Sequence, residues 1–256
     1  MTSLIRGLQS LILYALILGL GVVSLVWGLV ALVLYPVLPR ERGLTLGRAV
    51  ISHVYRQFWR VASAPGLLRM DASAIDVLRN EPGLIIVSNH PCVLDALMLV
   101  ARLPRSACVM KAELMVNPFL GPGARLARYI RNDTVIGTIR CCVKDLRRGG
   151  QLVLFPEGTR TVKHPINAFR PGVTLIAKLA KAPIQTVFID TDSPFTTKGW
   201  PLWKLPALPA RYTVRLGQRF EPERDDAALL RTLEAYVAEH TRTNVGDNLR
   251  RARESM

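Results

Sequence analysis

Two apolar stretches of this sequence each run into polar side chains that can do chemistry. The first spans Leu84 to Asp95 and reads LIIVSNHPCVLD, with His90 and Asp95 after the apolar run. A carboxylate bonded to one imidazole nitrogen fixes the tautomer and leaves the other nitrogen to accept a proton. The pair therefore indicates a general base, with a structural histidine that caps a helix as the alternative.

The spacing of the pair places His90 before a helix and not inside it. Five residues turn a regular helix by about 500°, so His90 and Asp95 would not share a helical face. Pro91 suits the first helical position. No GxSxG elbow is present, and neither Ser88 nor Cys92 lies in a context that specifies a nucleophile. The simplest chemistry is removal of a proton from a substrate hydroxyl, which then attacks an activated acyl carbon.

The second stretch, Leu152 to Arg160, reads LVLFPEGTR and has the same build. Gly158 allows a tight turn between Glu157 and Arg160, and a guanidinium fork suits a phosphate group. The alternative is a structural ion pair between Glu157 and Arg160. We expect the two strand ends to form opposite walls of one active site.

Short apolar runs alternate with helical stretches from about Asp71 onward, which predicts an α/β fold. Helix-length connections favour a largely parallel sheet flanked by helices, with the active site at the carboxyl ends of the strands. The predicted strands are 84–87, 107–110, 151–155, 184–189 and 212–216, and the predicted helices are 94–103, 118–129, 139–148, 173–180 and 225–240.

Charge and cysteine usage narrow the class of partner. The 256 residues carry a formal net charge of +15, with basic residues spread along the chain. Such a surface suits nucleic acid or an anionic membrane surface. The apolar N-terminus favours the membrane, and no nucleic-acid motif competes with it. Four cysteines without CxxC spacing indicate reduced thiols, no zinc site and a cytoplasmic catalytic domain.

Residues 1–42 are predicted to form an N-terminal apolar helical membrane anchor. Residues 11–38 are almost wholly apolar and would reach about 42 Å as one helix, against about 30 Å of hydrocarbon. The anchor is therefore a tilted single span or a re-entrant hairpin broken at Gly19, Gly21 or Gly28, and we favour the hairpin. Arg40, Arg42 and Arg48 after the run place the catalytic domain on the cytoplasmic side of the inner membrane.

The remaining chain divides into residues 43–70 and residues 71–256. The first part is predicted to be an amphipathic helix, lying at the lipid headgroups or packed on the domain. The second is the α/β domain with a basic C-terminal tail from Asn244, which includes Arg250, Arg251 and Arg253. The Trp- and Pro-rich segment 195–210 is a packed loop or a second lipid-facing surface, and we favour the packed loop.

At this point the sequence resembles a known family. SNHPCVLD is similar to the NHxxxxD block, and FPEGTR to the FPEGTR block, of glycerolipid acyltransferases of the lysophospholipid or 1-acyl-sn-glycerol-3-phosphate acyltransferase type. The resemblance covers residues 84–189. KAELMVNPFLGPGARLARYIRND, from Lys111 to Asp133, looks like the lysine-led second block, and KAPIQTVFI looks like the fourth.

The resemblance implies roles for individual residues. His90 would be the base and Asp95 its orienting partner, while Glu157, Gly158, Thr159 and Arg160 would bind the phosphate end of the acceptor. Lys111 and Arg131 complete the predicted substrate-binding set, which is Glu157, Gly158, Thr159, Arg160, Arg131 and Lys111. No metal and no cofactor are implied, because an acyl thioester on coenzyme A or acyl carrier protein is the donor substrate.

Two departures from the family pattern concern the acceptor. Thr134 follows Asp133 where the family usually has an arginine, so that role is lost or has moved to Arg131. Only Pro183 stands in the fourth block, where two prolines are usual.

The resulting prediction is a membrane-associated O-acyltransferase that acts on a lysophospholipid, with 1-acyl-sn-glycerol-3-phosphate as the first choice. The alternatives are a different lysolipid acceptor, such as a lyso-ornithine lipid or an intermediate of a specialised acyl-lipid pathway, a lipid esterase, and a non-catalytic membrane module.

Overall fold

The computed structural model describes the backbone of residues 2–201, 204 and 206–254, and the side chains of residues 7–201, 204 and 206–241. In chain order the helices, 3-10 helices (η) and strands are α1 (Thr2–Val37), α2 (Arg40–Ser63), β1 (Leu68–Asp71), η1 (Ser73–Leu78), β2 (Leu84–Ser88), α3 (Asp95–Arg102), β3 (Ser106–Lys111), η2 (Ala112–Met115), α4 (Gly121–Leu126), β4 (Ile130–Asn132), α5 (Val135–Arg147), β5 (Gln151–Leu154), α6 (Gly172–Ala180), β6 (Ile184–Thr191), β7 (Ala210–Phe220) and α7 (Asp226–Glu254).

The strands of the described chain form one seven-stranded sheet in the order β1-β7-β6-β2-β5-β3-β4. Neighbouring strands are parallel except for the antiparallel pair β6 and β7. Parallel strands joined by helices are covered on both faces, and every residue of the central strand β2 is buried. The predicted α/β fold with a largely parallel sheet is therefore confirmed, while the short strands β1 and β4 were not predicted.

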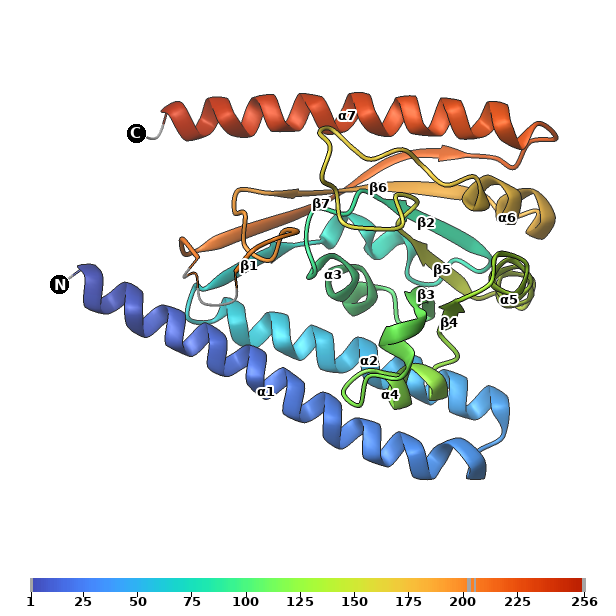
Figure 1. The fold of residues 1–256 in the computed structure, drawn as a ribbon, viewed down its shortest axis with the longest axis horizontal. Helices are drawn as coiled ribbons and strands as arrows, with labels where there is room; N and C mark the ends of the chain where they lie inside the picture. The colour runs from blue at the N-terminus through green and yellow to red at the C-terminus, as the bar shows by residue number, and fades with distance from the viewer. Residues whose placement is uncertain (1, 202–203, 205, 255–256) are drawn as a thin grey trace.

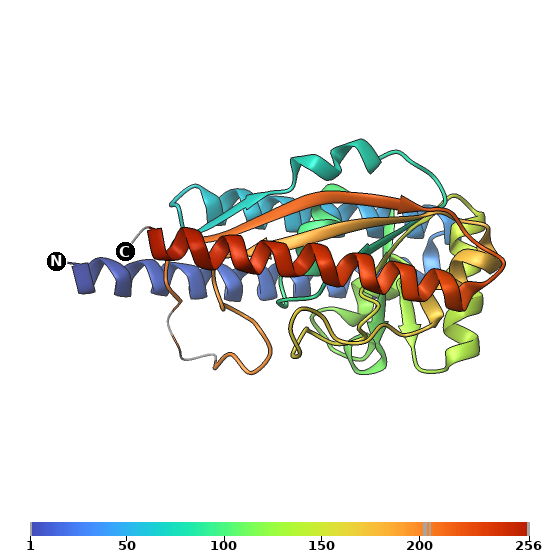
Figure 2. The same cartoon turned by 90° about the horizontal axis from the view of Figure 1, so that it is seen from above.

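Helices cover both faces of the sheet in layers (Figure 1). Helix α3 lies against one face, α2 packs on the far side of α3, and α1 is outermost. Helix α7 lies along the other face, where it meets α6. The loops between β5 and α6 and between β6 and β7 project to the same side of the molecule (Figure 2). That side carries the polar strand ends that the sequence marks out.

Helix α1 is continuous, so the glycines do not break it. The helix runs from Thr2 to Val37 through Gly19, Gly21 and Gly28. The chain reverses at Leu38 and Pro39 instead, because a proline after the last turn cannot continue the helix. The expected break within the apolar run is thus corrected, and α1 and α2 form the two arms of a helical hairpin. Of the described helices, one (Gly7–Val37) is long and apolar enough to cross a membrane, with 11% of its apolar window buried.

Small residues pack α1 and α2 closely against the α/β domain. A Cβ atom on Gly28 of α1 would lie 3.2 Å from the carbonyl oxygen of Pro118. A Cβ atom on Gly123 of α4 would lie 2.9 Å from the Trp27 ring. Gly47 of α2 is packed still more closely against the end of α4. The apolar helix is therefore seated on α4 and does not project freely from the domain.

Helix α2 buries its apolar side within the domain. Ile51, Phe58 and Trp59 are at most 8% exposed, and the Trp59 ring meets Tyr212 edge-on at 5.6 Å. Arg48 is 3% exposed and forms a 2.7 Å ion pair with Asp145. Arg48 therefore forms a buried ion pair within the fold and is not part of the exposed basic flank. Of the three arginines named after the apolar run, Arg40 and Arg42 are the exposed ones.

Two further expectations concern segments near the C-terminus. The loop after β6 is packed in its described part, where Phe195 is buried and meets Trp200 edge-on. Residues 202, 203 and 205 lie outside the described residues. Helix α7 continues to Glu254, so the backbone of the basic tail predicted from Asn244 is helical as far as that residue. The side chains of the tail arginines, Arg250, Arg251 and Arg253, lie outside the described residues.

Candidate active site at the ends of strands β2 and β5

His90 lies in the turn between β2 and α3, as its spacing from Asp95 requires. Its Nδ1 is 2.7 Å from Oδ2 of Asp95. The His90 side chain is 19% exposed and that of Asp95 is fully buried. Burial raises the pKa of the Asp95 carboxyl, whereas the hydrogen bonds from His90 and Cys92 favour its charged form. The pair therefore holds the imidazole in one orientation, and the His90 side chain stays partly exposed.

Cys92 is part of the support of Asp95 and not a nucleophile. Its backbone N–H donates to Oδ2 of Asp95 over 2.8 Å, and its thiol donates to Oδ1 over 2.9 Å. Burial, followed by the charge of Asp95, raises the pKa of the Cys92 thiol well above its ordinary value. Ser88 is also buried and donates its hydroxyl hydrogen to the backbone carbonyl of Asn89. Both side chains are therefore inaccessible to a substrate.

The loop that follows β5 makes three contacts with His90. The Phe155 ring stacks on the imidazole with centroids 4.1 Å apart. The backbone N–H of His90 donates to Oε1 of Glu157 over 3.1 Å, and the N–H of Thr161 donates to the carbonyl of His90 over 2.8 Å. Since β2 and β5 are paired neighbours, the two polar strand ends meet as expected.

Glu157 organises the loop from within. It is 4% exposed, and its carboxylate accepts hydrogen bonds from the hydroxyl of Thr161 over 2.7 Å and from the N–H of Asn167 over 2.8 Å. Gly158 has φ of +69°, and a Cβ atom there would lie 2.5 Å from Nε of Arg170. These contacts show Glu157 and Gly158 fixing the shape of the turn that was predicted to bind phosphate.

Arg160 joins this loop to the one after β6. Its Nη1 donates to the carbonyl oxygens of Thr196 and Thr197, both over 2.9 Å. The ion pair between Glu157 and Arg160 that the sequence left open is not formed among the described side chains. Thr159 is half-buried in the same turn. Nη1 of Arg160 therefore links the loop after β5 to the loop after β6.

The remaining two predicted ligands lie further along the sheet and diverge. Lys111 is exposed at the end of β3, and its strand partner is Asn132. Arg131 pairs with Met110, so its side chain leaves the sheet on the face opposite to that of Lys111. Strand β4 is three places from β2, about 14 Å at the usual strand spacing. The structure therefore does not bring Arg131 to His90.

Asn89 is a positioning residue that the sequence analysis missed. Its amide nitrogen donates to the carbonyl of Ile189 over 2.9 Å, and its amide oxygen accepts from the N–H of Ile189 over 2.8 Å. The side chain thus extends the pairing of β2 and β6 by one step and fixes the backbone before His90. An asparagine at a strand end, next to a histidine, is the signal that was available. Phe155 was missed as well, because its stacking on His90 depends on strand pairing.

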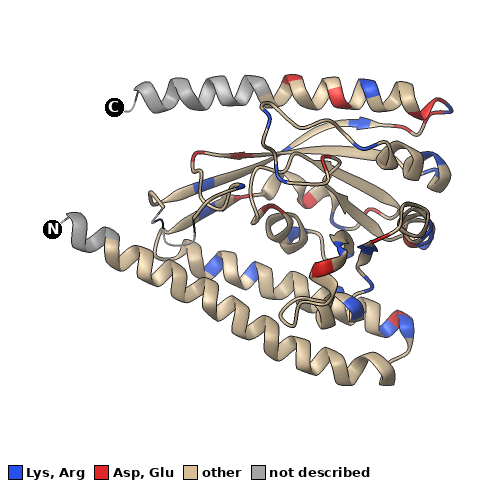
Figure 3. Cartoon of the chain, in the orientation of Figure 1, with Lys and Arg blue, Asp and Glu red and all other residues tan. Residues whose placement is uncertain are grey.

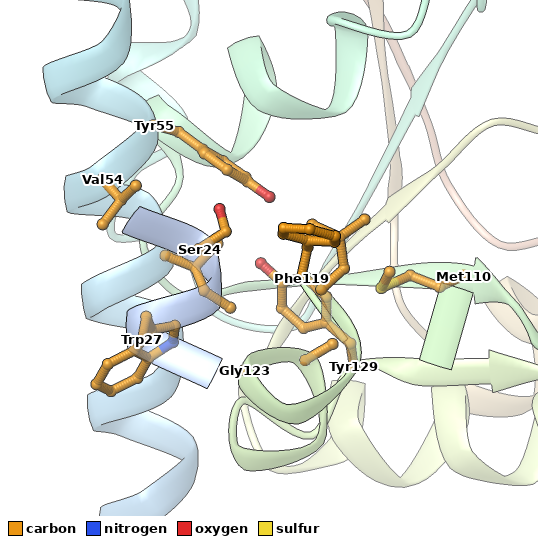
Figure 4. Close-up of a pocket in the computed structure, with 11 residues that line it drawn as sticks. Ser24, Trp27, Val54, Tyr55, Met110, Phe119, Gly123 and Tyr129 are labelled. Carbon is orange, nitrogen blue, oxygen red and sulfur yellow. The ribbon is translucent and has the colours of Figure 1, made fainter. Parts of the chain in front are cut away.

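An apolar pocket lies away from this site, between α1, α2 and α4. Figure 4 shows Ser24, Tyr55 and Phe119 directed toward a common space above Gly123. Its volume is about 40 Å³. A water molecule takes about 30 Å³ of liquid, so the pocket in this form has no room for an acyl chain.

Comparison with known proteins agrees with this geometry. A family model described as Acyltransferase matches residues 69–190, which include both polar strand ends. The chain is 24% identical, over 93% of its length and 91% of the relative, to a 1-acyl-sn-glycerol-3-phosphate acyltransferase of Pseudomonas aeruginosa. It is 28% identical, over 65% of its length and 32% of the relative, to lysophosphatidylcholine acyltransferase 1 of Rattus norvegicus.

A solved structure shares the fold. The 1-acyl-sn-glycerophosphate acyltransferase of Thermotoga maritima aligns with a TM-score of 0.69 and 17% identity, over 93% of this chain and 97% of that one. The domain match over residues 69–190 and the likeness to these relatives confirm the resemblance seen in the sequence, and the solved structure shows that the fold is shared.

Proposed function

We propose that this protein transfers a fatty acyl group from a thioester to the free hydroxyl of a lysophospholipid, with 1-acyl-sn-glycerol-3-phosphate as the first choice of acceptor and phosphatidic acid as the product. The observation that carries the proposal is the 2.7 Å contact between His90 Nδ1 and the buried Asp95 carboxylate. Its support is the name shared by relatives from Pseudomonas aeruginosa and Helicobacter pylori, both 1-acyl-sn-glycerol-3-phosphate acyltransferases.

The mechanism uses His90 as a general base. With Nδ1 bonded to Asp95, Nε2 takes the proton of the acceptor hydroxyl as the oxygen attacks the thioester carbonyl carbon. The C–O bond forms, the C–S bond breaks, and the imidazolium returns the proton to the departing thiolate. No covalent acyl-enzyme is needed, which agrees with the burial of Ser88 and Cys92.

The donor in this proposal is acyl-CoA or acyl-ACP, and the site of action is the membrane. Both carriers are acidic, and a net charge of +15 favours their approach. Helix α1 would hold the enzyme in the inner membrane with the catalytic domain on the cytoplasmic side, because Arg40 and Arg42 follow the apolar run. Lys111, Thr159 and Arg160 would face the acceptor headgroup, with Glu157 and Gly158 fixing the shape of the turn.

The decisive test is His90→Ala in the full chain. Purified protein, an acyl thioester and 1-acyl-sn-glycerol-3-phosphate are incubated, and phosphatidic acid is measured. We expect a rate loss of about 10²–10⁴, the usual contribution of a positioned base. His53→Ala is the matched control, because His53 is exposed on α2 and contacts only Gln57 among the described side chains. Near-normal turnover of His90→Ala would exclude the role, and free fatty acid as the sole product of the wild type would indicate an esterase.

A second acceptor class is favoured by two specific observations. Thr134 stands where related enzymes usually have an arginine, and Arg160 gives one of its two terminal nitrogens to backbone carbonyls. Both reduce the cationic groups available to a phosphate, which suits a zwitterionic acceptor such as a lyso-ornithine lipid. Rates measured side by side with 1-acyl-sn-glycerol-3-phosphate and a phosphate-free lysolipid decide between the two classes. Arg160→Ala should slow the phosphate acceptor far more than the phosphate-free one.

A further inference from the structure

A groove lined by basic side chains lies beyond the edge strand β4. It is enclosed by the turn between α1 and α2, the segment from α4 to β4, and α5, and it has a volume of about 370 Å³. We call it the basic groove. The cations that line it are Arg40, Arg125, Arg128, Arg131, Lys144 and Arg148, against the two carboxylates of Asp133 and Asp145. Neither His90 nor the loop after β5 contributes to it.

The carboxylates in the basic groove leave most of its positive charge uncompensated. Asp133 is paired with Arg131 at 3.0 Å, and Asp145 is paired with the buried Arg48 at 2.7 Å. Arg148 is paired with Glu41 at 3.1 Å, so four of the six lining cations have no carboxylate partner within the described part of the chain. The side chains of Arg40 and Lys144 have no hydrogen-bond or ion-pair partner among the described residues. Cations gathered in this way repel one another, so an anion in the groove is stabilised.

Arg128 ties the basic groove to the end of α1. Its guanidinium lies 4.3 Å from the centre of the Tyr35 ring, and its Nη1 donates to the Tyr35 hydroxyl over 2.6 Å. Its backbone φ is +55°, a left-handed conformation that is unfavourable for a residue with a side chain. Its Nε is buried with no hydrogen-bond partner in the described structure, so Nη1 and Nη2 are the atoms of this guanidinium left to meet a ligand.

Apolar surface begins where the basic groove ends. On the last turns of α1, Leu32, Val33 and Val37 are 51%, 67% and 71% exposed. Figure 3 shows α1 without charged residues along its described length and a group of basic residues where it meets α2. A ligand that fits both surfaces has an anionic head and an apolar tail.

We propose that the basic groove binds the phosphate of an anionic membrane phospholipid whose acyl chains lie along the exposed face of α1, at a site separate from the acyl-transfer site. The proposal rests on the membrane association of α1 proposed above. The bound lipid would fix the depth and orientation of the domain at the bilayer. A groove of 370 Å³ holds about twelve water volumes and thus accommodates a phosphate headgroup.

The test uses Cys141, which is exposed and lines the groove. The full chain is mixed with vesicles of phosphatidylglycerol or of phosphatidylcholine, and the rate of Cys141 modification by uncharged N-ethylmaleimide is read by peptide mass spectrometry. We expect phosphatidylglycerol to slow the modification severalfold relative to phosphatidylcholine. In the double variant Arg40→Gln, Lys144→Gln, the affinity for phosphatidylglycerol vesicles should fall on the order of 30-fold and the protection should disappear.

Matched variants keep the result interpretable. Arg40 and Lys144 are exposed and make no side-chain contact that the fold needs, so the double variant should fold. The double variant Arg211→Gln, Arg224→Gln removes two exposed cations elsewhere and should keep both vesicle binding and protection. Arg128→Gln should lose protection as well. Retained protection in the groove variants, or equal loss in the control, would overturn the proposal.

Two further arms separate the sources of the phosphate and the two proposals. Protection of Cys141 by soluble pyrophosphate or by coenzyme A, equal to that by phosphatidylglycerol, would assign the groove to a soluble phosphate and overturn the lipid site. Equal binding to both vesicle types without protection would overturn the lipid site while membrane association stands. Failure to bind either vesicle would overturn both, and acyl transfer measured with soluble short-chain acceptor would still test the catalytic proposal.

Discussion

Charged side chains are paired within the protein in the active-site turn but partly unpaired in the basic groove. In the active-site turn, each carboxylate is satisfied by the protein itself: Asp95 accepts from His90 and twice from Cys92, and Glu157 accepts from His90, Thr161 and Asn167. In the basic groove, cations outnumber carboxylates and two of them have no described partner. The hydrogen bonds of the first site fix the orientation of its side chains, whereas the unpaired cations of the second site favour the binding of an anion.

The difference predicts different sensitivities. Hydrogen bonds between buried groups depend little on salt, so the turnover rate of bound enzyme at saturating donor should change little with ionic strength. Attraction between exposed cations and a lipid surface is screened within about 8 Å at physiological salt, so vesicle binding should weaken as salt rises. Substitutions in the active-site turn should therefore change the turnover rate, and substitutions in the basic groove should change vesicle binding.

The largest effect is expected from Asp95→Asn. An amide has one acceptor oxygen in place of two, and its NH₂ group faces donors, so His90 and Cys92 cannot both be satisfied. We expect the rate of acyl transfer to fall by about 10²–10⁴, with vesicle binding unchanged. Asp76→Asn is the control, since Asp76 forms an exposed ion pair with Arg102. A rate within tenfold of wild type would mean that Asp95 does not orient the base.

How much of each site the sequence could predict depends on how far apart its residues lie along the chain. The pairing of His90 with Asp95 was predictable because five residues confine both to one turn. The contact of Asn89 with Ile189 joins residues 100 positions apart, and only the pairing of β2 with β6 brings them together. The basic groove gathers residues from Tyr35 to Arg148, so the sequence could not show which side chains share a surface with Arg131.

The reversal of the chain after α1 gives a second lesson of the same kind. Glycines within an apolar run indicate a possible break, but Gly28 serves packing against Pro118 instead. The reversal occurs at Leu38 and Pro39, whereas Pro36 lies inside α1 and does not end the helix. The sequence analysis placed the break at a glycine because the use of each glycine depends on the neighbour that tertiary structure supplies.

A smaller effect, on stability, is expected from Glu157→Gln. The substitution leaves a buried backbone N–H of His90 or Asn167 without an acceptor, which costs about 1–3 kcal/mol of the free energy of unfolding. Glu81→Gln removes the partly exposed ion pair with Arg219 and should cost about 0–1 kcal/mol. Urea unfolding of both variants measures the difference. Equal losses would mean that Glu157 is not the organising acceptor of the turn.

The smallest effect concerns the two faces of α5, where Cys142 is buried toward the core and Cys141 is exposed in the basic groove. Burial raises the pKa of the Cys142 thiol to about 12. The unfolded thiol titrates near 8.5, so above that pH the unfolded chain loses a proton that the folded chain keeps. Stability from this thiol is thus fully present below about pH 8.5 and falls as pH rises toward 12.

The measurement compares unfolding free energies at pH 7.5 and pH 10 for two alanine variants. In Cys142→Ala, the drop in stability between the two pH values should be smaller than in wild type by about 1–2 kcal/mol, because that thiol no longer titrates in the unfolded chain. Cys141→Ala is the matched control and should keep the wild-type drop, since the exposed Cys141 side chain is not removed from water on folding. If both variants behaved alike, the two faces of α5 would not differ in burial as the structure requires, and the assignment of Cys141 to an open groove would lose its basis.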